Sequence, residues 1–102
     1  MSTVAPILTI SVAASLLKVH PRTLMLYERA GLLSPFRTGT KRRLFSFNDL
    51  DHLQFIKYLT QNKGMNLNSI KILLEAIAVC DREGINLKKI LFPTFRARKL
   101  IE

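Results

Sequence analysis

The side chains best suited to chemistry in this sequence are the cations between residues 18 and 45. Seven lysines and arginines lie in this stretch against a single carboxylate, that of Glu28. Ammonium and guanidinium groups at this density are suited to binding phosphates through charge-assisted hydrogen bonds. The whole chain carries a formal charge of +9 and a pI of about 10.3, a balance typical of proteins that bind nucleic acid.

Basicity alone does not identify a partner, because a charged surface also serves solubility or attraction to an acidic membrane. The last fifteen residues form a second basic zone, with five cations against Glu102, while residues 46–87 are nearly balanced in charge. The helices and strands predicted to carry residues 18–45 must therefore show whether this charge serves nucleic-acid binding, solubility or attraction to a membrane.

Other reactive side chains are few. Cys80 is the only cysteine, which excludes an intrachain disulfide and zinc sites built of four cysteines and fits a reducing cytoplasm. It is expected to be a small core residue, with metal or redox sensing as the alternative. His20 precedes a proline at a helix start, where capping or phosphate contact is the ordinary role. His52 lies between Asp51 and Leu53 in a predicted helix, where a solvated or half-buried histidine is expected.

The sequence does not favour an enzyme. It contains no glycine-rich phosphate loop, no recognisable nucleophile–base pair and no carboxylate cluster, so we predict no enzymatic activity, no metal and no cofactor. The apolar stretch 4–19 lacks a basic start and is interrupted by polar residues, so we expect neither a signal peptide nor a membrane span. A cytoplasmic protein is expected.

Two short helices must position the first half of the basic zone. Ser11 is expected to cap a helix that ends at Leu17, with Val12, Leu16 and Val19 on its apolar face. Pro21 is suited to a first helical position and predicts a second helix to about Ala30, where Gly31 can end it. Two helices joined by about three residues are typical of a helix-turn-helix, in which the second helix reads DNA.

A β-hairpin is predicted between residues 33 and 46, because apolar and polar residues alternate on both sides of Thr38-Gly39-Thr40. Gly39 is available there for a positive φ. Residues 1–9 are expected to form a loose arm with an extended piece around Ile7.

Three further helices are predicted. Ser46 and Asp49 suit a capping box for a helix ending by Gly64, and Asn66 is expected to cap another that runs until Gly84. A brief helix should end near Leu91, before Pro93. The expected fold is mainly α with a small β-hairpin wing, divided into an arm (1–9), a winged helix-turn-helix domain (10–80) and a C-terminal tail (81–102).

The segments Ile10-Ser11-Val12-Ala13 and Val19-His20-Pro21-Arg22-Thr23-Leu24-Met25-Leu26-Tyr27-Glu28-Arg29 resemble the DNA-binding domain of the MerR family, and within it the heat-shock repressor branch. The similarity continues through Arg37-Thr38, Arg43-Leu44-Phe45-Ser46 and Asp49-Leu50-Asp51-His52-Leu53. The resemblance implies a sequence-specific regulator of transcription, a repressor by analogy with that branch, that binds double-stranded DNA as a homodimer.

This resemblance and the charge pattern together predict the DNA-contacting residues. The recognition helix and wing are expected to contribute Lys18, His20, Arg22, Thr23, Met25, Tyr27, Arg29, Arg37, Thr38, Lys41, Arg42 and Arg43. For Tyr27 we favour DNA contact over a core position. Met25 replaces an arginine and Phe45 a tyrosine of the family pattern, so the operator sequence cannot be taken from relatives.

The C-terminal tail leaves alternatives open. The chain has only about twenty residues after Cys80, too few for the long helix and effector domain usual in the family. Dimerisation is instead expected through the apolar residues Leu87, Ile90, Leu91, Phe92 and Phe95. Alternatives are an excisionase-like or architectural protein that bends DNA, and an interaction module that docks an acidic protein partner through the basic hairpin and tail.

Overall fold

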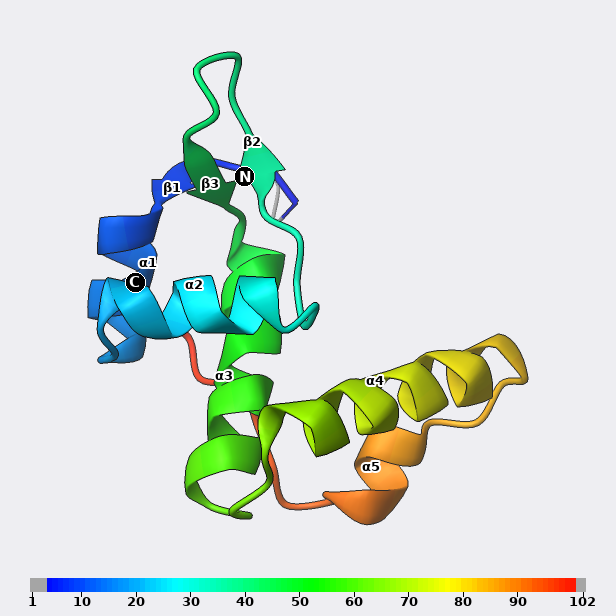
Figure 1. The fold of residues 1–102 in the computed structure, drawn as a ribbon. Helices are drawn as coiled ribbons and strands as arrows, with labels where there is room; N and C mark the ends of the chain where they lie inside the picture. The colour runs from blue at the N-terminus through cyan, green and yellow to red at the C-terminus, as the bar shows by residue number, and fades with distance from the viewer. Residues whose placement is uncertain (1–3, 101–102) are drawn as a thin grey trace.

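The computed structural model describes residues 4–100, which form five helices and three short strands (Figure 1). In chain order these are β1 (Leu8–Thr9), α1 (Ile10–Leu17), α2 (Pro21–Arg29), β2 (Phe36–Arg37), β3 (Arg43–Phe45), α3 (Phe47–Gln61), α4 (Leu67–Arg82) and α5 (Leu87–Leu91). The predicted fold class, mainly helical with a small β wing, is confirmed. Residues 1–3 of the predicted arm and 101–102 of the predicted tail lie outside the described residues.

The first helix begins two residues earlier than the sequence suggested. Its N-cap is Thr9, whose extended backbone leaves Oγ1 to accept a hydrogen bond from the Val12 N–H at 3.3 Å, and Ser11 is already inside the helix. The buried face consists of Ala13, Ala14 and Leu17. Val12 is exposed and Leu16 only half-buried, which corrects the predicted apolar face.

The second helix follows the prediction closely. The Nδ1 atom of His20 accepts a hydrogen bond from the Arg22 N–H at 3.0 Å, so His20 is the N-cap, and Pro21 occupies the first helical position. The helix ends at the Ala30 C-cap, and Gly31 follows with φ of 81°, a conformation that favours glycine. Helices α1 and α2 pack together through Leu17, Leu24 and other buried side chains.

The wing is a three-stranded antiparallel sheet in the order β1-β3-β2. Leu8 lies opposite Phe45 in the β1–β3 pair, and Phe36 lies opposite Leu44 in the β2–β3 pair. The Ile7 N–H extends the first pair by donating to the Phe45 carbonyl at 3.1 Å. The end of the predicted loose arm is therefore a strand that ties the hairpin to the start of α1.

Helix α3 forms the centre of the core. Ser46 and Asp49 make both hydrogen bonds of the predicted capping box, at 3.0 and 2.9 Å, and fix where the helix begins. Its buried residues are Leu50, Leu53, Phe55, Ile56 and Leu59, which pack against both helices of the helix-turn-helix and against Phe45.

The C-terminal half folds back on α3. Asn66 caps α4 as predicted, and Ile70 is the fully buried residue of that helix, which projects away from the rest of the molecule (Figure 1). After α5, Phe92 and Phe95 pack against Phe55 with ring centroids 5.5 and 5.3 Å away. These two aromatic residues, predicted to serve dimerisation, pack within the chain on the aromatic surface that α3 presents.

Candidate nucleic-acid interface

The open face of α2 combines cations with one apolar side chain. Arg22, Leu26 and Arg29 are exposed and follow the four- and three-residue spacing of one helix face. Leu26, 45% exposed, was missed by the sequence reasoning, although its position one turn after Arg22 could have indicated it. Such a face can place guanidinium groups beside phosphates and an alkyl group beside a thymine methyl.

Tyr27 does not belong to this open face. The residue is only 5% exposed and lies in the core cluster with Leu24, so the interpretation that favoured DNA contact is corrected. The three-residue spacing from Leu24 allows both side chains to lie on one side of the helix, and both are buried in the same cluster. Thr23 and Met25 are half-buried at the edge of the open face.

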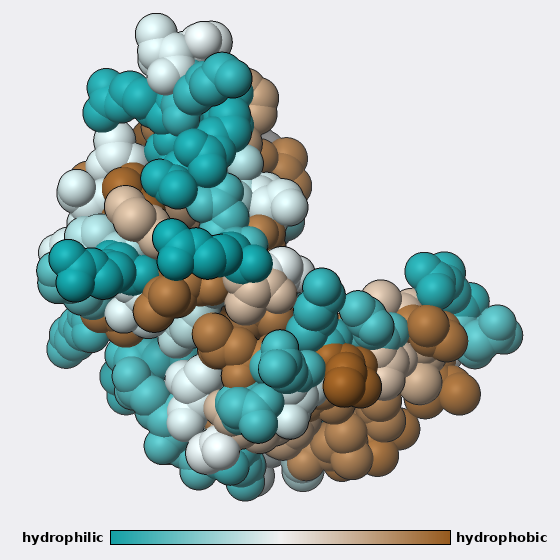
Figure 2. Space-filling view, in the orientation of Figure 1, coloured by the Kyte–Doolittle hydropathy of each residue, from teal (hydrophilic) through white to brown (hydrophobic). Residues whose placement is uncertain are grey.

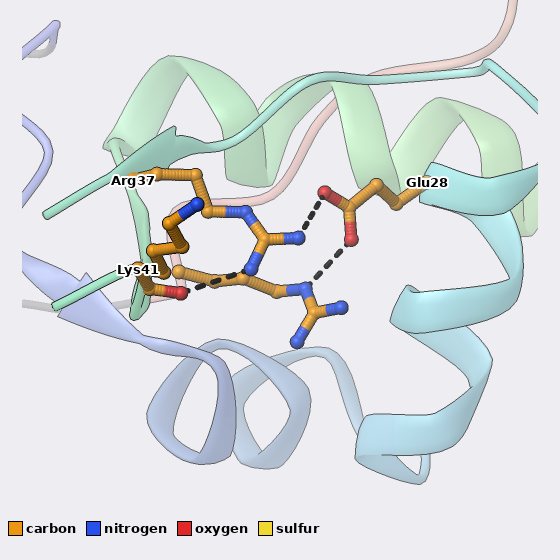
Figure 3. Close-up of polar contacts among 4 residues, drawn as sticks. Glu28, Arg37 and Lys41 are labelled. Atoms are coloured by element: carbon orange, nitrogen blue, oxygen red, sulfur yellow. Dashed lines mark hydrogen bonds and ion pairs between the residues drawn. The ribbon is translucent and has the colours of Figure 1, made fainter.

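Glu28 connects the recognition helix to the wing. Its Oε1 accepts a hydrogen bond from Arg43 Nε at 2.6 Å, and its Oε2 accepts one from Arg37 Nη2 at 2.8 Å (Figure 3). Arg37 also donates from Nη1 to the Lys41 carbonyl at 3.0 Å, which ties β2 to the turn (Figure 3). The one carboxylate of the basic zone therefore fixes the wing relative to α2. The sequence had indicated only that Glu28 reduces the net charge of the zone.

This arrangement stabilises the ionised carboxylate. Burial alone would raise the pKa of Glu28, but the hydrogen bonds and positive charges of Arg43 and Arg37 outweigh it and lower the pKa below its ordinary value of 4.5. Arg43 uses only Nε in this contact, and its two Nη groups have no protein partner among residues 4–100. Arg43 can therefore hold the wing and still donate outwards.

Five cations of the helix-turn-helix and wing have no acidic partner in the described part of the chain. All five are exposed. They are Lys18 in the turn, Arg22 and Arg29 on α2, and Lys41 and Arg42 at the tip of the wing. Figure 2 shows hydrophilic surface gathered over the wing and α2, whereas hydrophobic surface lies over α4 and α5.

The turn at the wing tip is built differently from the prediction. The positive φ falls on Lys41, at 65°, and not on Gly39. The Lys41 N–H donates to the Thr38 carbonyl at 2.8 Å, and the Arg42 N–H donates to Thr38 Oγ1 at 3.1 Å. A turn followed by one left-handed residue is a common three-residue hairpin loop, and glycine is the residue that usually fills the left-handed position.

Two lysines of the basic zone adopt the left-handed backbone conformation. Within residues 4–100, Lys18 (φ 58°) and Lys41 (φ 65°) are the non-glycine residues with positive φ. A side chain at such a position is strained by about 1–2 kcal/mol, so a residue other than glycine there suggests a use for its side chain. Lys18 lies in the turn before α2, and Lys41 lies at the tip of the wing.

Replacing Lys41 by glycine should stabilise the fold while weakening attraction to polyanions. Relief of strain outweighs the greater chain entropy of glycine in the unfolded state, and we expect a net gain of about 0.5–1 kcal/mol in the free energy of unfolding. Urea denaturation measures this. The matched control, Lys41→Ala, removes the same charge but keeps the strained Cβ, so equal stability of the two variants would contradict the backbone argument.

The remaining candidate residues have structural roles. His52 donates from Nε2 to the Leu32 carbonyl at 2.9 Å, which fixes the segment between α2 and the wing to α3. Cys80 is half-buried on α4. Within the part of the chain that the structure describes, no three His, Cys, Asp or Glu side chains gather as metal ligands, and no helix is long and apolar enough to cross a membrane.

Comparison with known proteins places this geometry in a family. The profile of the MerR HTH family regulatory proteins matches residues 8–77. The putative heat shock protein HspR of Streptomyces coelicolor is 44% identical over 70 residues, which cover 69% of this chain and 46% of that protein. The HTH-type transcriptional regulator GlnR of Bacillus anthracis is 43% identical over 70 residues, 69% of this chain and 54% of its own length.

A third relative, the HTH-type transcriptional regulator MlrA of Salmonella typhimurium, is 38% identical over 69 residues, 67% of this chain and 28% of that protein. The chain thus spans about half the length of the first two relatives and less of the third. Each match covers about as many residues as the segment from β1 to α4, which carries the helix-turn-helix and the wing. The chain therefore belongs to the MerR family of helix-turn-helix regulatory proteins.

Proposed function

We propose that this protein is a sequence-specific regulator of transcription, without enzymatic activity, that inserts α2 into the major groove of double-stranded DNA. The observation that carries the proposal is the group of five exposed cations on α2, in the turn before it and at the wing tip, none of which pairs with a carboxylate of residues 4–100. Cations without carboxylate partners on one surface favour DNA binding, because they neutralise phosphates and release the counterions condensed on the duplex. Membership of a family of regulatory proteins supports the same function.

The side chains divide into two roles in this proposal. Arg22, Leu26 and Arg29 approach the base edges and the phosphates that border the groove, with Thr23 and Met25 at their margin. Lys18, Lys41 and Arg42 contact phosphates on either side and set the register of the protein on DNA. The His20 side chain caps α2 through Nδ1, which leaves Nε2 available to a phosphate of the DNA backbone.

We further propose repression as the direction of control, by analogy with the resemblance to heat-shock repressors, in a cytoplasmic, nucleoid-associated protein. A homodimer is expected through the apolar surface of α4 and α5, where Ile72, Ile90 and Leu91 are exposed, Ile90 to 64%. Isolated exposed apolar residues are ordinary, but a contiguous group favours an interface. Sedimentation that shows only monomer at micromolar concentration would remove the dimer from the proposal.

Selection from a random duplex library, followed by a salt series, tests the proposed function. Enrichment of one palindromic site supports a sequence-specific dimer. Strong bending at many adjacent sites would instead favour an architectural protein, and enrichment of nothing would contradict DNA recognition by this surface. Measured affinity should fall with salt at a log–log slope of about −0.9 for each phosphate contacted.

Changing Arg42 to alanine should weaken binding to all duplexes by a similar factor and make the salt slope shallower by about 0.9, because a phosphate contact carries no base information. Lys89→Ala is the matched control, since Lys89 is an exposed cation on α5, away from the wing. An equal effect of the two substitutions would mean that the wing has no specific place on DNA.

A further inference from the structure

A cavity of about 510 Å³ lies on a part of the molecule that the proposed DNA contacts hardly use. Its walls come from the last turn of α1, from the middle of α3 and from the tail segment 94–100. Four cations line it, one or two from each wall: Lys18, Lys57, Arg96 and Arg98. Among the described residues the lining contains no aspartate or glutamate, so its charged side chains are all cations.

The tail wall is held in place by defined contacts. The side-chain amide of Gln54 on α3 donates from Nε2 to the Arg98 carbonyl and accepts at Oε1 from the Arg98 N–H, both at 2.8 Å. Phe95 packs on Tyr58 with ring centroids 4.9 Å apart. The paired hydrogen bonds use the backbone of Arg98 and leave its guanidinium free to face the cavity.

Within residues 4–100 the four cations have no acidic partner. Lys57 donates one hydrogen bond from Nζ to the Leu17 carbonyl at 2.8 Å, and Arg96 donates from Nη1 to the carbonyls of Pro93 and Phe95. Each therefore retains N–H groups for another acceptor. Like charges that converge on one hollow repel one another unless an anion enters.

We propose that this cavity binds a small organic phosphate. Its volume falls within the range of small-molecule sites, and its cations converge on a concavity, whereas a duplex requires a ridge or an open face. Leu16 and Leu100 offer apolar walls for the carbon part of the ligand, and Gln61 offers an amide. Lys18 belongs both to this cavity and to the basic surface beside α2, so binding of the ligand and of DNA should affect each other reciprocally.

Calorimetric titration of the full chain with AMP, inorganic phosphate and adenosine tests this site. AMP should bind most tightly, because inorganic phosphate lacks the nucleoside that would contact the leucine walls and adenosine lacks the phosphate that would contact the cations. Arg98→Ala should weaken AMP binding at least about tenfold, as expected for loss of a charge-assisted contact. The variant keeps the backbone bonds to Gln54, so its thermal unfolding should be unchanged. Lys99→Ala, which alters a neighbouring tail cation outside the cavity lining, should bind AMP like the parent protein.

Three results would overturn the proposal. The first is AMP binding that Arg98→Ala leaves unchanged, and the second is adenosine binding as tightly as AMP. The third is a loss of duplex affinity in Arg98→Ala as large as in Arg42→Ala, which would assign the cavity cations to the DNA surface. The site does not depend on the proposed regulatory function, because AMP binding is measured without DNA.

Discussion

Glu28→Gln is expected to loosen the wing, to lower the free energy of unfolding by about 1–2 kcal/mol and to reduce discrimination between DNA sequences. The substitution keeps the shape of the side chain but removes the charge that holds Arg43 and Arg37 at 2.6 and 2.8 Å. Hydrogen bonds to charged groups contribute about 1.5–3 kcal/mol, a value reduced here because the side chains are partly exposed to water.

The same substitution should raise affinity for non-specific DNA and steepen its salt dependence, because two released guanidinium groups become available to phosphates. If Glu28 positions the wing, the variant should lose discrimination between DNA sequences while its affinity for non-specific DNA rises. If Glu28 only reduces the net charge, affinity should rise and discrimination should be unchanged. Glu75→Gln is the matched control, since Glu75 is exposed on α4 and forms no ion pair with a cation of residues 4–100. Discrimination that survives Glu28→Gln would show that the wing is placed by other contacts.

The carboxylate also predicts a response to acid. The pKa of Glu28 is lowered in the folded protein, so the stability it contributes is present above the unfolded-state pKa of 4.5 and is lost as the pH falls through the lower folded value. The difference in unfolding free energy between the parent protein and Glu28→Gln should therefore be constant near neutral pH and shrink below about pH 4. A difference independent of pH would contradict the ion-pair explanation.

Phe55→Ala should have the largest effect on stability, a loss of about 3–5 kcal/mol. Phe55 is 1% exposed and lies against Phe92 and Phe95, while the Lys88 ammonium sits 4.4 Å from its ring centre. Removing the ring leaves a cavity and takes away the surface on which the tail packs. For a domain of this size, the expected loss is a large part of the total stability.

Urea denaturation measures this loss, and hydrogen exchange should show weaker protection of the backbone amides of residues 92–100 in Phe55→Ala. Phe36→Ala is the control, because Phe36 is 54% exposed on β2 and its removal should change stability little. If the tail keeps its protection in Phe55→Ala, the aromatic cluster does not hold it.

Local signals in the sequence predicted the elements well. Pro21 after His20, and Gly31 after the last turn, define both ends of α2 within a few neighbouring residues. The capping box of Ser46 and Asp49 likewise depends on residues three apart. Such contacts are determined by the backbone geometry of one turn, which is why sequence patterns reveal them.

The features that the sequence did not predict depend on contacts between distant segments or on competition between similar residues. Thr9 and Ser11 are both hydroxyl residues suited to capping, and the pairing of β1 decides for Thr9. The contact of Glu28 with Arg43 joins residues fifteen apart, and that of Gln54 with Arg98 joins residues forty-four apart. For Tyr27, spacing alone left both a core position and a surface position open, and packing against α3 decides for the core.

The short strand β1 also has a consequence for how the protein folds. Its pairing with β3 joins Leu8 to Phe45, so the chain between them, which contains both helices of the helix-turn-helix and the whole hairpin, becomes a closed loop. Closing this loop has an entropic cost, which the packing of the enclosed helices and hairpin on one another offsets. We therefore expect the wing and the two helices to form together, late and in one kinetic step, at a rate set by the docking of a two-residue strand.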